Sequence, residues 1–142
     1  RIPRMFGFQA SGAAPIVNGA PVTHPHTIAT AIRIGNPASW KLAEAARDES
    51  GGVIQAVTDR QIAAAYKLLA QEEGVFVELA SAASVAGLLQ AHDQGLVAPG
   101  GRIVCTVTGN GLKDPDWAIS GAPTPVTIPI DAHAAAVALE LA

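Results

Sequence analysis

The sequence is poor in cysteine, in aromatic residues and in charge. A single cysteine among 142 residues excludes an internal disulfide framework and suits a reducing compartment. Charged residues make up only 15%, and the net charge of −3 argues against nucleic acid or an acidic membrane as a partner. No stretch is long and apolar enough to cross a bilayer, and no signal-peptide pattern opens the sequence. We therefore expect a cytoplasmic protein.

Several site motifs are missing as well. His24 and His26 have no third ligand candidate nearby in the sequence, so no metal site is predicted. Neither Gly-x-Gly-x-x-Gly nor Gly-x-x-x-x-Gly-Lys-Ser/Thr occurs, which weighs against a nucleotide-binding module. A non-catalytic, Rossmann-like ligand-binding domain stays open as an alternative. The chain starts at Arg1 and runs almost directly into an apolar segment, so we expect a fragment that lacks an N-terminal part.

The residues that are present predict a folded α/β domain. Hydrophobic residues make up 49% of the chain, enough for a core. Short apolar runs alternate with segments of helical periodicity, a pattern typical of a mostly parallel sheet with helices on both faces, in three layers. The expected strands are residues 5–9, 53–57, 75–77 and 102–107, with an edge strand at 126–130. We assign residues 1–142 to one domain, with 119–142 as a less regular tail.

Four positions are predicted to begin helices. Asn36 precedes Pro37, a residue suited to the first helical position. Thr58 is followed three residues later by Gln61, the spacing of a capping box. Ser81 and Asp131 precede segments rich in alanine, and each is expected to cap its helix.

The most informative stretch is residues 102–114. Its first half is apolar and β-branched, which predicts a strand buried on both faces, with Cys105 as a buried, inert thiol. Gly109-Asn110-Gly111 then imposes a turn. Ligands of α/β sheets bind beyond the carboxyl ends of strands, so Thr108 would present its hydroxyl there. The two glycines would let a flat or anionic group approach the backbone.

This stretch and three others resemble one enzyme family. They are Thr106-Val-Thr-Gly-Asn-Gly-Leu-Lys-Asp114, Glu78-Leu-Ala-Ser-Ala-Ala-Ser84, Arg4-Met-Phe-Gly-Phe-Gln-Ala10 and Thr27-Ile-Ala-Thr-Ala-Ile-Arg-Ile-Gly-Asn-Pro37. In their order along the chain they are similar to the C-terminal half of threonine synthases, which are fold-type-II enzymes that use pyridoxal phosphate. The resemblance runs from about Arg4 to Asp116.

The resemblance implies a cofactor contact for one residue. Thr108 would meet the pyridine nitrogen of pyridoxal 5'-phosphate through its hydroxyl. The family's Schiff-base lysine and glycine-rich phosphate loop belong to motifs that do not occur in these residues, so we expect no catalytic residue here and no activity of the chain alone. Lys113 lies beside Asp114, which favours its charged form and argues against a Schiff base.

Two further positions keep alternative interpretations. Glu78 either lies near the cofactor or caps the helix that follows, and Asn36 either lines the pocket or caps a helix. Leu79 stands where the family usually has proline, which puts the local geometry of this turn in question. Tyr66 is interpreted as a packed helix tyrosine rather than as a catalytic acid.

The implied reaction converts O-phospho-L-homoserine and water to L-threonine and phosphate, and homodimers are common in the family. Protons would leave Cα and Cβ, phosphate would leave Cγ, and water would add at Cβ. A serine/threonine dehydratase or a related lyase is the alternative within the same fold. The run Thr-Gly-Asn-Gly-Leu-Lys-Asp favours the synthase, since related dehydratases more often carry a serine- or cysteine-Gly-Gly turn.

Overall fold

The computed structural model describes residues 2–142, and its centre is a two-stranded parallel sheet. Strand β1 (Phe6–Ala10) pairs with β2 (Val53–Val57) in a register that places Phe6 beside Val53 and Ala10 beside Val57. The strands predicted at 5–9 and 53–57 are therefore confirmed, the first with a shift of one residue. Parallel strands need a long crossover connection, and residues 11–52 supply it.

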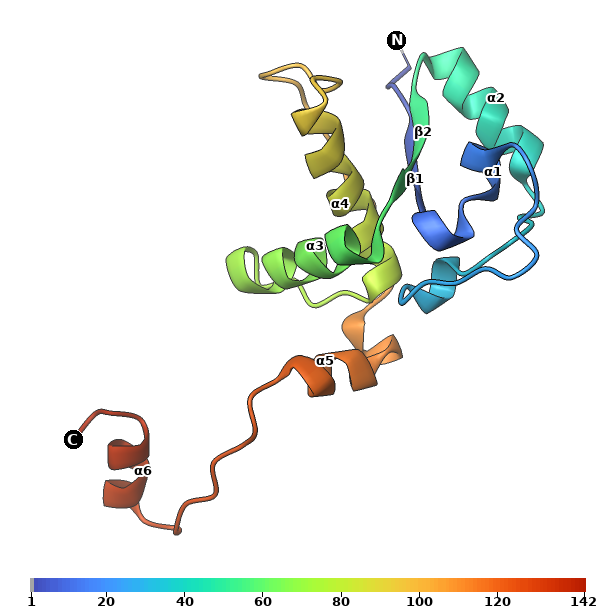
Figure 1. Ribbon diagram of the computed structural model, residues 1–142. Helices are drawn as coiled ribbons and strands as arrows, with labels where there is room; N and C mark the ends of the chain where they lie inside the picture. Colours follow the sequence, from blue (N-terminus) through green and yellow to red (C-terminus); the bar gives the residue numbers. More distant parts are fainter. Residues whose placement is uncertain (1) are drawn as a thin grey trace.

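Helices cover both faces of this sheet (Figure 1). On one face, α4 (Leu79–Asp93) contacts both strands, and α3 (Asp59–Glu72) packs against α4. On the other face, α1 (Pro15–Asn18) and α2 (Trp40–Ser50) contact β2. The predicted α/β class, with a parallel sheet between helices, is confirmed.

Small side chains let α4 pack closely on the sheet. The core consists mainly of alanines together with Val57, Ile62 and Leu79. Gly87 lies directly over the ring of Phe8, and a Cβ atom on residue 87 would lie 2.1 Å from that ring. Close contact between α4 and β1 therefore depends on the absence of a side chain at this position.

Two of the predicted helix caps are confirmed. The Thr58 hydroxyl accepts a hydrogen bond from the Gln61 amide at 3.2 Å, and the Gln61 side chain bonds the Thr58 amide at 2.8 Å. The Asp131 carboxylate accepts from the Ala134 amide at 2.8 Å at the start of α6 (Ala132–Ala138). In both cases residues three apart satisfy amides that the first helical turn leaves free.

The other two predicted caps are wrong. Helix α2 begins at Trp40 after Ser39, because Pro37 fixes only its own backbone angle and the first helical bond runs from the Ala43 amide to the Ser39 carbonyl. Helix α4 begins at Leu79 after Glu78, so Ser81 lies inside its first turn. The Ser81 hydroxyl has a different partner, described below.

The strand predicted at 102–107 is not formed in the structure. These residues have no ladder partner, and Val104 is 86% exposed. A strand requires a neighbour that supplies backbone hydrogen bonds, and the sheet of residues 2–142 consists of β1 and β2 alone. For the same reason, residues 126–130 form no edge strand, and residues 75–77 contribute only one isolated bridge, from Val77 to Asn110.

The C-terminal residues extend away from the sheet. A short 3-10 helix, η3 (Gly111–Lys113), leads into α5 (Pro115–Gly121), from which Trp117 packs against the core. Residues 122–131 are irregular, and α6 lies apart from the other elements (Figure 1). The domain assignment, with a tail from residue 119, stays a prediction. Within residues 2–142, none of the helices combines the length and apolar character that a membrane span requires.

Candidate functional site

The turn that follows Thr108 lies against the segment that leads into α4. The Glu78 amide donates to the Gly109 carbonyl at 2.9 Å, and the Gly111 amide donates to the Phe76 carbonyl at 3.2 Å. These two bonds flank the antiparallel bridge between Val77 and Asn110. Two of the sequence motifs, Glu78–Ser84 and Thr106–Asp114, are thus joined in one site.

Ser81 completes this junction from the first turn of α4. Its hydroxyl accepts from the Gly109 amide at 2.7 Å and lies 3.2 Å from the Gly109 carbonyl, to which it can donate. Ser81 is 4% exposed, and Gly109 is buried as well. Sequence analysis predicts a cap at Ser81, and no local pattern points to a partner 28 residues further along the chain.

The two glycines of the turn serve packing rather than ligand access. A Cβ on residue 109 would lie 1.8 Å from Oε1 of Glu78, and a Cβ on residue 111 would lie 2.4 Å from the ring of Phe76. The space beside each glycine is therefore filled by the protein's own side chains. The expectation that these glycines leave room for a bound group is therefore wrong for the space that a Cβ would occupy at residues 109 and 111.

Thr108 itself is exposed at the start of the turn. Its hydroxyl makes no hydrogen bond with any group in the part of the chain that the structure describes. The residue next to it is held on both its amide and its carbonyl, so the backbone around Thr108 is fixed while the side chain is accessible. The role predicted for Thr108 concerns a cofactor and stays a prediction.

Glu78 and Lys113 form an ion pair across the site, with 3.4 Å between Nζ and Oε1. The Glu78 side chain is 8% exposed, whereas that of Lys113 is 62% exposed. Glu78 directly precedes α4 but makes no capping hydrogen bond with its side chain. Its carboxylate therefore packs under Gly109 and pairs with Lys113 instead of capping the helix.

Leu79 occupies the first position of α4 and is 2% exposed in the core. Proline is favoured at the first helical position because its amide would be unpaired there in any case. A helix can begin at this residue with either side chain, and here leucine adds apolar contacts. The turn between Glu78 and Ser81 is regular, with the Ser81 amide donating to the Glu78 carbonyl at 3.1 Å.

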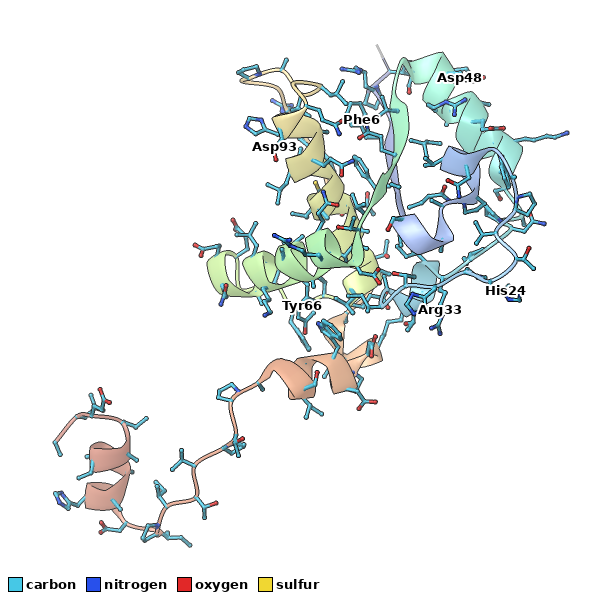
Figure 2. The ribbon with its side chains drawn as sticks, viewed as in Figure 1. Phe6, His24, Arg33, Asp48, Tyr66 and Asp93 are labelled. Atoms are coloured by element: carbon cyan, nitrogen blue, oxygen red, sulfur yellow. The ribbon has the colours of Figure 1, made fainter. Side chains whose placement is uncertain are left out.

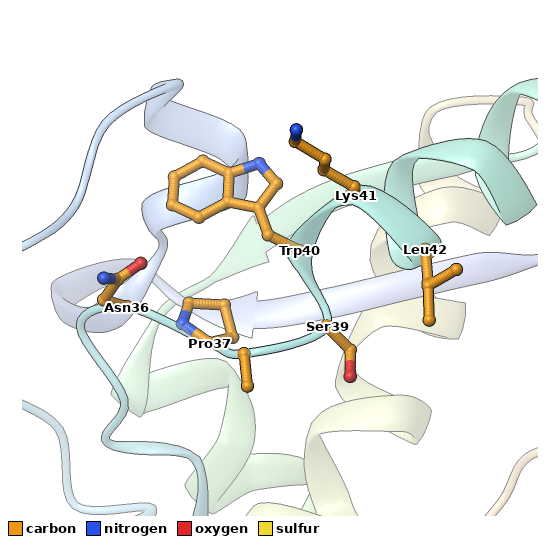
Figure 3. Close-up of a pocket in the computed structure, with 7 residues that line it drawn as sticks. Asn36, Pro37, Ser39, Trp40, Lys41 and Leu42 are labelled. Carbon is orange, nitrogen blue, oxygen red and sulfur yellow. The ribbon is translucent and has the colours of Figure 1, made fainter.

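Two of the open cavities on the surface of residues 2–142 bear on the predicted site residues. One, of about 510 Å³, adjoins the turn through Asp114 and is lined by Thr27, Ile28, Thr30, Arg33, Asp114, Asp116, Trp117 and Ser120. The other, of about 430 Å³, is lined by residues 36–42 (Figure 3). Asn36 lines this second cavity, which includes none of the residues of the Thr108 turn. The first cavity is the one that we associate with the site.

Tyr66, Cys105 and His24 take no part in the hydrogen bonds of the junction. Tyr66 on α3 meets the Phe76 ring edge to face at 6.4 Å, and burial raises the pKa of its hydroxyl, as expected for a packed tyrosine (Figure 2). The sequence predicts a buried thiol at Cys105, but this residue is only partly buried in the structure. Partial burial still raises the pKa of the thiol. His24 lies on the loop after α1 (Figure 2), and residues 2–142 contain no metal-binding cluster of His, Cys, Asp or Glu.

Comparison with known proteins assigns this chain to a family. The pattern of the family described as "Pyridoxal-phosphate dependent enzyme" matches residues 1–109. The threonine synthase of Mycobacterium leprae is 61% identical over 134 residues, which are 94% of this chain and 37% of that protein. The threonine synthase of Mycobacterium bovis is 58% identical over 142 residues, 100% of this chain and 39% of that protein.

One solved structure supports the fold. The crystal structure of a threonine deaminase from T.th. matches with a TM-score of 0.51 and 19% sequence identity, over 63% of this chain and 34% of that one. The chain spans well under half the length of the two curated relatives. Because the family pattern covers 109 of the 142 residues and includes the Glu78–Ser84 motif, this chain belongs to the family of pyridoxal-phosphate dependent enzymes.

Proposed function

We propose that this chain is the C-terminal part of a threonine synthase, which converts O-phospho-L-homoserine and water to L-threonine and phosphate. The observation that carries this proposal is the 58% identity to the Mycobacterium bovis threonine synthase over all 142 residues, which include the whole Thr108 turn. The identity of 61% to the Mycobacterium leprae protein over 134 residues supports it as well.

The residues present fit one part of pyridoxal phosphate, the ring nitrogen. Thr108 offers an accessible hydroxyl that no neighbouring group engages within residues 2–142, on a backbone that is held in place. A hydroxyl can donate to an unprotonated ring nitrogen, whereas a carboxylate would hold that nitrogen protonated. Pyridoxal phosphate, when bound, supplies the electron sink for bond breaking next to the substrate's amino group.

The other parts of the cofactor site are proposed to lie outside this chain. The three lysines here are Lys41, Lys67 and Lys113. Lys113 is paired with Glu78, and the other two belong to α2 and α3, away from the Thr108 turn. The lysine that attaches the cofactor and the loop that holds its phosphate therefore belong to the N-terminal region, and this chain alone is expected to be inactive.

The test uses the completed enzyme, meaning this chain preceded by the N-terminal region that the relatives carry. We expect it to release phosphate from O-phospho-L-homoserine with equal amounts of L-threonine. The alternative, a serine/threonine dehydratase, predicts ammonia release from L-serine or L-threonine and no phosphate release from O-phospho-L-homoserine. That second result would contradict the proposed reaction, but the chain would still belong to the family of pyridoxal-phosphate dependent enzymes.

The assembly and location are part of the same proposal. We propose a cytoplasmic homodimer with O-phospho-L-homoserine as its small-molecule partner. Sedimentation of the completed enzyme should give twice the mass of one chain, and cell fractionation should recover it with cytoplasmic markers. The single cysteine, which forms no disulfide within the chain, supports a reducing compartment.

A further inference from the structure

We propose that Ser81 is a positioning residue for the cofactor and acts through the backbone of the Thr108 turn. The inference rests on the proposed function for the role of Thr108. The geometry of Ser81 comes from the structure alone. Ser81 contacts Gly109, the residue that follows Thr108, and so fixes the peptide group that joins the two residues.

The hydrogen bonds between Ser81 and Gly109 are buried. The Gly109 amide donates to Ser81 Oγ at 2.7 Å, while the Gly109 carbonyl accepts from the Glu78 amide at 2.9 Å and lies 3.2 Å from Ser81 Oγ. Both polar backbone groups of Gly109 are thus satisfied by the start of α4. With Ser81 only 4% exposed, solvent has little access to replace its hydroxyl.

The planarity of the peptide bond links this contact to Thr108. The amide of Gly109 and the carbonyl of Thr108 belong to one planar peptide group. A hydrogen bond that fixes the direction of the amide therefore also fixes the backbone angle ψ of Thr108. Glycine has the widest backbone freedom of any residue, so residue 109 would not hold this plane by itself. The hydroxyl of Ser81 supplies the restraint.

Ser84 provides a matched comparison on the same helix. Its hydroxyl donates to the Ser81 carbonyl at 2.9 Å, three residues back within α4, and makes no hydrogen bond with the Thr108 turn within residues 2–142. Loss of the Ser84 hydroxyl removes a local helical contact only. Loss of the Ser81 hydroxyl leaves the buried Gly109 amide without its partner and frees the plane next to Thr108.

The experiment compares pyridoxal phosphate binding by the completed enzyme and by its Ser81→Ala and Ser84→Ala variants. Removal of one partner of a buried hydrogen bond predicts a dissociation constant raised about tenfold for Ser81→Ala, and a value within about twofold of the parent for Ser84→Ala. The absorption spectrum of the bound cofactor should shift only in Ser81→Ala, because only there does the ring nitrogen lose a well-placed partner.

A Ser81→Ala enzyme with the parent's affinity and spectrum would overturn the inference. So would an equal loss in both variants, since that would indicate a general role of the helix. A second measurement needs no variant. The Gly109 amide of the cofactor-free parent should be protected from hydrogen exchange, and exchange at the rate of an open amide would overturn the inference even if Ser81→Ala did not fold.

These outcomes do not depend on whether the proposed synthase reaction is correct. A parent that binds pyridoxal phosphate but releases no phosphate from O-phospho-L-homoserine would contradict the synthase proposal. The affinity, spectral and exchange comparisons would still decide the role of Ser81 in that case.

Discussion

The carboxylate of Glu78 fills the space that any side chain on residue 109 would need. A Cβ there would lie 1.8 Å from Glu78 Oε1 and 2.1 Å from Cδ, far inside contact distance. Since Glu78 is also the residue that leads into α4, the turn and the helix are packed as one unit. Any side chain at residue 109 would therefore have to displace the Glu78 carboxylate.

Replacing Gly109 with alanine should disrupt this unit. In the completed enzyme we expect Gly109→Ala to displace Glu78, to lower the free energy of unfolding by about 1–3 kcal/mol as overpacking does, and to weaken pyridoxal phosphate binding. Gly121→Ala is the control, because a Cβ on residue 121 would meet no atom within 4 Å. Urea unfolding and a cofactor titration provide both readouts. Equal behaviour of the two variants would refute the packing role of Gly109.

A side chain at residue 87 should also be destabilising, because the Phe8 ring occupies the space beside this glycine. A Cβ at this position would lie 2.1 Å from the Phe8 ring, so Gly87→Ala must displace the ring or push α4 away from β1. We expect a loss of about 1–3 kcal/mol in unfolding free energy, measured against the same Gly121→Ala control. Restored stability in the double variant Gly87→Ala with Phe8→Leu would show that the ring is the obstacle.

Lys113 is predicted not to be the attachment point of the cofactor. Its ammonium is largely exposed and paired with the Glu78 carboxylate, whereas an attacking amine must be uncharged. After borohydride reduction of the completed enzyme, the Lys113→Ala variant should retain the covalent cofactor to the same extent as Lys67→Ala. Mass spectrometry of the peptides checks this. A cofactor mass on the peptide that contains Lys113 would show this prediction to be wrong.

The capping box of α3 should contribute measurably to stability. Thr58→Ala removes the acceptor for the Gln61 amide, and loss of such a cap costs about 1 kcal/mol. The control is Ser39→Ala, because Ser39 precedes α2 without a side-chain capping bond. Urea unfolding of both variants of the completed enzyme should separate them. A loss for Ser39→Ala as large as for Thr58→Ala would mean that the capping bond is not the cause.

Features set by neighbouring residues could be predicted from the sequence. Strand β2 is rich in β-branched residues, and α3 starts at a capping box whose partners are three residues apart. The start of α5 at Pro115 and the glycine end of α2 at Gly51 depend on equally local chemistry. In such cases the residues that decide the structure lie within one turn of each other.

Features that depend on distant partners could not be predicted. The apolar run at 102–107 carries a strand pattern, but pairing depends on a neighbour in space, and β1 and β2 do not provide one. Ser81 has the composition of a cap, and its bonds to Gly109 appear only once the fold joins the two motifs. The role predicted for Thr108 rests on the resemblance of its motif to the family, and it stays a prediction.

The proposed cofactor contact depends most directly on Thr108. The decisive measurement is phosphate release from O-phospho-L-homoserine, together with cofactor absorbance, for the completed enzyme and its Thr108→Val and Thr106→Val variants. Thr106 is an exposed threonine two residues earlier and serves as the control. We predict that Thr108→Val loses most of its turnover and shows a perturbed cofactor spectrum, while Thr106→Val matches the parent. An unchanged Thr108→Val enzyme would contradict the contact between Thr108 and the cofactor, and a parent without any cofactor band would contradict the proposed function as a whole.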